Sequence, residues 1–393
     1  MPQAITISTG LDYSAALRDI DRLGQIIASK DIKAKLNARG FTEPLGRITG
    51  SATEFNKSLD AANARVLAFS VSAGLLFKFK ACLEAIVQSA IDVEKTLTDI
   101  NVVLNLNTQQ LSKFGQDLFK IANLTGKSFK DVAAAALELS RQGLGVGETL
   151  KRTNDALILT RLSGLDAASS VEALTAAING FDKSALQSTD IINKLASVDA
   201  SFAVSSRDLA EALKRVGSTA QDAGVDFDEL LAVVTAVQQT TARGGAVIGN
   251  ALKSIFTRIS RRDTIQDLQQ LGVSIDESQS GIEKLRALAQ ALNDLGQANP
   301  GVANKIKELA GGVFQINIVS AALNDLNKQF SVYDSALRTA NNATDEAISR
   351  NQRLNQTLSA FANETLNNII EKSATVGQIS FEPVIRRVLG LVN

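Results

Sequence analysis

The sequence has no histidine and no tryptophan, and only one cysteine, one methionine and four prolines among its 393 residues. Without histidine, the chain has no Ser–His or Cys–His nucleophile pair and no imidazole that could act as a general base or metal ligand. The single cysteine, Cys82, excludes an intrachain disulfide and a cysteine-based zinc site. We therefore expect a protein that is not an enzyme and that needs no cofactor and no metal.

Net charge and long apolar runs are lacking as well. Lysine and arginine total 41 and aspartate and glutamate total 41, so no overall field attracts nucleic acid. The longest uncharged stretches, Val66–Phe77 and Leu309–Asn324, are shorter than the roughly 20 apolar residues that span a bilayer. The opening residues lack a basic segment followed by an apolar one, so we expect no secretory signal.

What the chain does contain is typical of helices. Apolar residues make up 45%, and alanine, leucine, serine, asparagine and aspartate are abundant. Nearly every segment after Leu11 has apolar residues at helical spacing, and only residues 4–9 suggest a strand. The predicted fold is all-α, with a multi-helix core of packed antiparallel helix pairs, long flanking helices and a C-terminal coiled-coil-like helix.

The pattern predicts five regions, which differ in glycine content and in apolar spacing. They are a strand and helix segment with a hinge (1–50), a long helix (51–105), a core helical domain (106–275), a helical extension (276–326) and a coiled-coil-like tail (327–393). The tail is predicted from a heptad-like seam of residues that runs from Phe330 to Phe361. Such a helix must pair with copies of itself or with the rest of the chain.

The core region contains a quasi-repeat. Residues 128–135 (SFKDVAAA) parallel residues 205–212 (SSRDLAEA), and in each a serine stands three residues before an aspartate. This spacing is a variant of the helix capping box, and an alanine-rich helix follows it. Two interpretations stay open: duplication of a helix pair, or chance similarity between capped alanine-rich helices.

The most informative short segment is Thr241–Arg262, TARGGAVIGNALKSIFTRISRR. It resembles a phosphate-binding loop, but a P-loop requires Lys and Ser or Thr immediately after its last glycine, and here Asn250 follows Gly249. Gly245 and Gly249 lie one helical turn apart on one face, where another helix can approach the backbone closely. We therefore interpret Gly244, Gly245 and Gly249 as packing positions at a helix junction.

Four cations follow these glycines: Lys253, Arg258, Arg261 and Arg262. One interpretation is a solvated helix end, where cations suit the helix dipole. The other is contact with acidic groups, such as the phosphates of DNA. No aromatic residues are interleaved with these cations, which argues against specific binding of single strands.

The ordered segments of residues 93–275 resemble the core of phage tail tape measure proteins. The resemblance is carried by VEKTLTDINVVLN from Val93, LTGKSFKDVAAAALELSRQGLGVGETL from Leu124, NDALILTRLSGLDAASSVEALTAAINGF from Asn154, VDASFAVSSRDLAEALKRVGSTAQDAGVDFDELLAVVTAV from Val198 and TARGGAVIGNALKSIFTRI from Thr241. Each piece alone is a capped alanine-rich helix, and their order and spacing make the match specific. KIKELAGGVFQINIVSAAL, from Lys305, also resembles these proteins just after their core.

The resemblance implies a structural protein that is made in the bacterial cytoplasm and lies in the lumen of the phage tail tube. Its implied partners are further copies of itself in a trimer or hexamer, the tail tube protein, tail tip or baseplate hub proteins and tail assembly chaperones. It also implies release ahead of the genome, with transient contact with phage DNA or the host membrane; the cations above could then face the tube lumen.

Two alternatives belong to other functional classes. One is a cell-wall-degrading protein that uses Glu138 or Glu172 as its catalytic carboxylate, although a paired carboxylate arrangement is not evident from the sequence. The other is a membrane-active helical protein that uses Val66–Ile91 when it is ejected.

Overall fold

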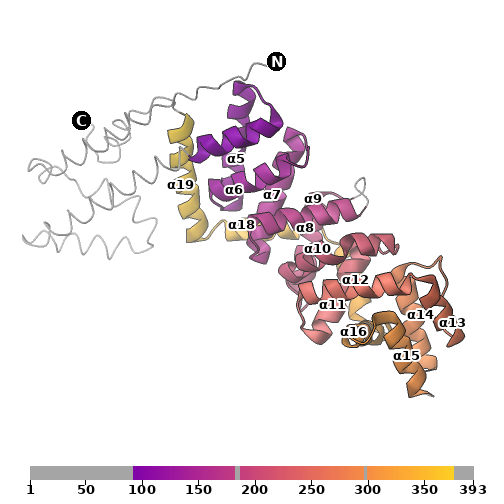
Figure 1. Ribbon diagram of the computed structural model, residues 1–393. Helices are drawn as coiled ribbons and strands as arrows, with labels where there is room; N and C mark the ends of the chain where they lie inside the picture. The colour runs from indigo at the N-terminus through magenta and orange to yellow at the C-terminus, as the bar shows by residue number, and fades with distance from the viewer. Residues whose placement is uncertain (1–91, 182–185, 296–298, 376–393) are drawn as a thin grey trace, which may run out of the picture. The chain divides into compact units, whose positions relative to one another are not determined.

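The computed structural model describes residues 92–181, 186–295 and 299–375, and all regular structure in these ranges is helical (Figure 1). The all-α prediction is confirmed. A helix over residues 92–104 comes first. The others are α5 (Thr108–Thr125), α6 (Phe129–Ser140), α7 (Val146–Ser163), α8 (Ala167–Gly180), α9 (Ser188–Ser201), α10 (Ser206–Asp222), α11 (Phe227–Thr241), α12 (Gly245–Ile259), α13 (Arg262–Gln270), α14 (Gly281–Asp294), α15 (Pro300–Gly311), α16 (Ile316–Leu326), α17 (Val332–Asn341), α18 (Glu346–Leu354) and α19 (Leu358–Thr375).

Several predictions from the sequence fall outside the described residues. These are the strand at residues 4–9, the hinge within 1–50, Cys82, the apolar stretch Val66–Phe77 and most of the long helix 51–105. The last turns of that helix are described, and they end at Asn105, whose φ of 51° leaves the right-handed helical region.

The described residues form two compact units: residues 92–133 with 355–375, and residues 134–354. In the first unit α19 packs along α5, and asparagines of α19 bind the turn between α5 and α6. Asn363 donates to the carbonyl of Gly126 (2.8 Å) and Asn367 to that of Lys127 (2.9 Å). Asn367 also accepts from the backbone N–H of Phe129 (3.1 Å). These amides satisfy backbone groups that a helix end leaves unpaired.

The second unit contains the predicted glycine junction, and α10 is its central helix. α10 packs mainly against α12 and α8 (Figure 1). α11 packs against α17 and α16. Asp208 meets Gly245 and Ala212 meets Gly249, so α10 and α12 run parallel in constant register. The connecting α11 must therefore run in the opposite direction.

Capping residues set where these helices begin. Ser205 and Asp208 form a reciprocal capping box at the start of α10, and Asp226 with Glu229 forms another at α11. Ser128 exchanges hydrogen bonds with Asp131 at the start of α6. Both serines of the quasi-repeat thus begin helices, as their spacing predicts. Asn299 is the N-cap of α15, with Pro300 in the first turn of this helix.

The prediction that the C-terminal region forms one coiled-coil-like helix is wrong. The seam that runs from Phe330 to Phe361 is divided among three helices, α17, α18 and α19. The break after α17 falls in the sequence NNATD, whose short polar side chains compete with helical hydrogen bonds. In the second unit Tyr333, Ala340 and Ala347 of the seam are buried, so the seam packs against earlier helices of the same chain.

Candidate functional site

The glycine junction brings the backbones of α10 and α12 into direct contact. A Cβ atom added to Gly245 would lie 1.8 Å from the carbonyl oxygen of Asp208, and one on Gly249 would lie 2.9 Å from Cα of Ala212. Gly244, the N-cap of α12, has a φ of 79°, a conformation that favours glycine. The structure thus places the three predicted glycines at a close helix contact.

Asp208 links the starts of the two helices. Its Oδ2 accepts from the backbone N–H of Ser205 (3.3 Å), which completes the capping box of α10, and also from the hydroxyl of Ser205 (2.5 Å). Its Oδ1 accepts from the backbone N–H of Gly245 (3.0 Å), one of the unpaired donors in the first turn of α12. A single carboxylate therefore caps two parallel helices, and its negative charge suits both helix N-termini.

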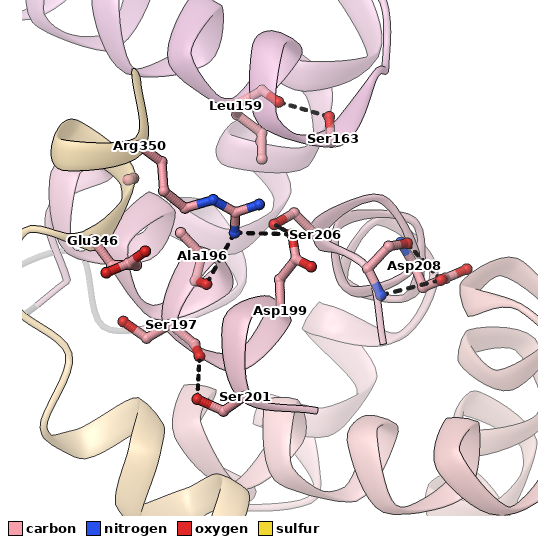
Figure 2. A network of polar contacts seen from close by, with 12 residues as sticks. Leu159, Ser163, Ala196, Ser197, Asp199, Ser201, Ser206, Asp208, Glu346 and Arg350 are labelled. Atoms are coloured by element: carbon pink, nitrogen blue, oxygen red, sulfur yellow. Dashed lines mark hydrogen bonds and ion pairs between the residues drawn. The ribbon is translucent and has the colours of Figure 1, made fainter. Parts of the chain in front are cut away.

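A second carboxylate, Asp199 at the end of α9, extends this arrangement to α18 (Figure 2). Asp199 Oδ2 accepts from the hydroxyl of Ser206 (2.7 Å) and from the guanidinium of Arg350 (3.3 Å). Arg350 also donates to the carbonyl of Ala196 (3.3 Å). We call Asp199, Ser206, Asp208 and Arg350 the polar node, because they connect the ends of α9, α10 and α12 with α18.

Other polar groups hold the ends of α17 and α18 against the earlier helices. Asn193, which is buried in α9, accepts from the backbone N–H of Ala347 in the first turn of α18 (3.0 Å). Lys194 donates to Asp228 (2.6 Å) and to the carbonyl of Ala340 in α17 (3.1 Å). Burial raises the pKa of the Asp228 carboxyl above its ordinary value, and the ammonium of Lys194 opposes this effect.

The start of α17 is anchored separately. The buried carboxylate of Asp325 accepts from the backbone N–H groups of Val332 (3.2 Å) and Tyr333 (2.8 Å). The guanidinium of Arg286 lies 5.0 Å from the ring centroid of Tyr333, within the range of a cation–π contact. We use the name polar dock for the residues that contact α17 and α18 in these two ways: Asn193, Lys194, Arg286 and Asp325.

The predicted basic cluster has a different environment at each of its members. Arg258 is half-buried and donates to the carbonyl of Leu309 (3.4 Å), near the C-terminal end of α15. Arg262 is paired with Glu277 (3.3 Å) at the surface. Lys253 and Arg261 are exposed. Arg258 thus has a structural environment, while Lys253 and Arg261 stay available for contact with a partner.

The two carboxylates considered for hydrolysis lie at the surface in ion pairs. Glu138 of α6 lies 3.5 Å from Arg141, the residue that directly follows this helix. Glu172 of α8 is paired with Lys214 of α10. Within the ranges that the structure describes, no group of three His, Cys, Asp or Glu residues is arranged to hold a metal ion.

Among the described helices, none is long and apolar enough by itself to cross a membrane. The pair Pro300–Gly311 and Ile316–Leu326 reaches the required length and composition together, but it is bent by 110°. This pair includes most of the uncharged stretch Leu309–Asn324.

Sequence reasoning missed most of the node and the dock. The residues concerned lie on amphipathic helices, where nothing distinguishes them in the sequence from other polar residues: Asp199, Arg350, Asn193 and Lys194. Besides the capping pair Ser205 and Asp208, the sequence offered one signal, Asn351, a polar residue on the predicted apolar seam. Asn351 is buried and accepts from the guanidinium of Arg161 (3.1 Å), so its position marks a polar contact with α7.

Comparison with known proteins identifies the family. A curated relative, the tape measure protein of Pneumococcus phage Dp-1, is 21% identical over 305 residues, which are 77% of this chain. The alignment covers 26% of the relative, so the chain spans about a quarter of that protein's length. No solved structure matches. The profile of phage-related minor tail proteins matches residues 108–313, from α5 to the end of α15 and more than half of the chain. The chain therefore belongs to the phage-related minor tail protein family, which consists of structural proteins of the phage tail.

Proposed function

We propose that this chain acts as a tape measure: it occupies the lumen of the tail tube, serves as a template for tube polymerisation and sets tail length. The observation that carries the proposal is the family match across α5 to α15, together with a tape measure protein as the curated relative. The helical structure of the described residues supports it, since a helix converts residue number into length at about 1.5 Å per residue.

The proposal includes partners and a release step. Copies of the chain, as a trimer or hexamer, lie inside a ring of tail tube subunits and contact the tail tip or baseplate hub, with assembly chaperones covering the chain beforehand. On infection the chains leave ahead of the DNA. A folded unit such as residues 134–354 must then open, or the tube must accommodate it.

Tail length measured in phage with altered chains tests the proposal. Deleting residues 276–326 in frame should shorten the tail by about 75 Å if this segment is a straight helix in the tube, and duplicating it should lengthen the tail by as much. Electron microscopy of purified particles gives the length. Tails of unchanged length in both variants would contradict the proposal, and the duplication keeps the test valid if the deletion yields no particles.

A further inference from the structure

Four exposed cations line the parallel pair α10 and α12. Arg207 and Arg215 belong to α10, Lys253 belongs to α12, and Arg243 lies in the loop before α12. Within the described residues none of the four takes part in an ion pair. They come from two segments that are separate in the sequence, so only the packing of α10 on α12 places them on one surface.

The register of the two helices sets the arrangement of these cations. A Cβ on Gly249 would lie 3.1 Å from Cβ of Arg215, and Lys253 follows Gly249 by one turn. Arg215 and Lys253 are therefore neighbours across the pair. Asp208 lies beside Gly244. Arg207 directly precedes Asp208, and Arg243 directly precedes Gly244. One group is Arg207 with Arg243, and the other is Arg215 with Lys253. The two groups are about 12 Å apart along the helix axis, because eight helical residues separate Arg207 from Arg215.

Acidic residues compensate this surface only in part. α12 contains no Asp or Glu, and Lys214 of α10 is already paired with Glu172. The carboxylate of Asp208 is engaged by Ser205 and Gly245, and Glu211 is half-buried between Arg207 and Arg215. An excess of positive charge remains, most of it on arginines, whose planar groups suit phosphate oxygens.

We propose that this surface, Arg207, Arg215, Arg243 and Lys253, binds the phosphate backbone of double-stranded DNA without regard to sequence. The spacing of about 12 Å between the two groups of cations spans several phosphates of one strand, because these repeat about every 3.4 Å along the axis of the duplex. The surface has no exposed aromatic side chain for base stacking, which favours a duplex over a single strand. That the phage genome is the natural ligand rests on the proposed function, whereas DNA binding by the chain does not.

Fluorescence anisotropy of the full chain with labelled duplexes of two unrelated sequences tests the proposal. Both duplexes should bind equally, in the range of about 10⁻⁴ to 10⁻⁶ M that is typical of nonspecific binding. Four phosphate contacts predict a slope of log K against log salt of about −3.6. R215Q/K253Q and R207Q/R243Q should each reduce this slope to about −1.8, and the control K113Q/K130Q, with two exposed lysines of the first unit, should leave it unchanged.

Three outcomes would contradict the proposal. They are no binding of DNA by the wild type at low salt, an unchanged salt slope in both double variants, or an equal reduction of the slope in the control variant. Poly-glutamate tests the competing class of partner. If it displaces the duplex at matched charge concentration, the surface recognises acidic polypeptides and the DNA assignment is wrong. Circular dichroism confirms that the variants are folded. Tail length is measured separately, so failure of DNA binding and failure of the tape measure function are distinguishable.

Discussion

Helices α12 and α18 are both held within residues 134–354, but by different kinds of contact. α12 buries five large apolar residues, Ile248, Leu252, Ile255, Phe256 and Ile259, and its glycines touch the backbone of α10. α18 buries only Ala347 and Asn351, and polar contacts hold it in place. It donates hydrogen bonds to Asn193, Ala196 and Asp199, and it accepts one from Arg161.

The difference has an energetic consequence. Full burial of a large apolar side chain contributes about 1.5–3 kcal/mol, so the apolar face of α12 contributes on the order of 10 kcal/mol as an upper bound. A typical hydrogen bond contributes about 0.5–1.5 kcal/mol net, which gives the contacts of α18 a few kcal/mol. We therefore expect α18 to open locally while the glycine junction opens only with the whole unit.

The largest expected effect comes from Gly245→Ala. The added methyl group would overlap the carbonyl oxygen of Asp208 at 1.8 Å, so the backbones of α10 and α12 must separate. We expect a loss of about 3 kcal/mol or more in the free energy of unfolding, at the upper end of overpacking costs. Urea unfolding followed by circular dichroism measures it.

The matched control is Gly147→Ala. This glycine lies in the first turn of α7, and an added Cβ would have no atom within 4 Å. Replacing it should be neutral or should stabilise the chain by up to about 1 kcal/mol, because alanine loses less backbone entropy. Equal unfolding midpoints for the two variants would refute the close packing at the junction.

A smaller and local effect is expected from Asn193→Ala at the polar dock. The substitution removes the acceptor of the buried N–H of Ala347, and an unpaired buried donor costs about 1–3 kcal/mol. Hydrogen exchange should quicken in residues 346–354 while exchange in α10 and α12 changes little. Asn304→Ala, at an exposed position of α15, serves as the control. Uniform acceleration across the unit would show that α18 is not a separate opening segment.

The smallest expected effect concerns pH. Burial raises the pKa of Asp228 above 3.8, so the folded chain binds this proton more tightly than the unfolded chain does. The wild type should therefore gain stability relative to Asp228→Asn as the pH falls from about 7 to about 4, and lose it again as the pH rises. Urea unfolding across this range measures the difference. A difference that grows with rising pH would contradict the raised pKa.

Some features of the fold were predictable because their causes are local. The Ser205 and Asp226 boxes fix where α10 and α11 begin, and the four-residue spacing of Gly245 and Gly249 indicated a close helix contact. The seam around Tyr333 and Ala340 was correctly predicted to be buried, but periodicity alone could not show which surface it would pack against. A heptad-like pattern fits both a coiled coil and a helix that packs on its own chain.

The sequence by itself determined the helical class, the family and the helix starts, because composition, apolar spacing and capping depend on residues within a few turns of each other. The tertiary structure alone decided that Asp208 caps two helices and that Arg350 reaches Asp199. It also gave Arg258 a hydrogen bond to the carbonyl of Leu309 and placed Arg215 beside Gly249, one turn before Lys253. These contacts join residues far apart in the chain, and their formation depends on how whole helices pack.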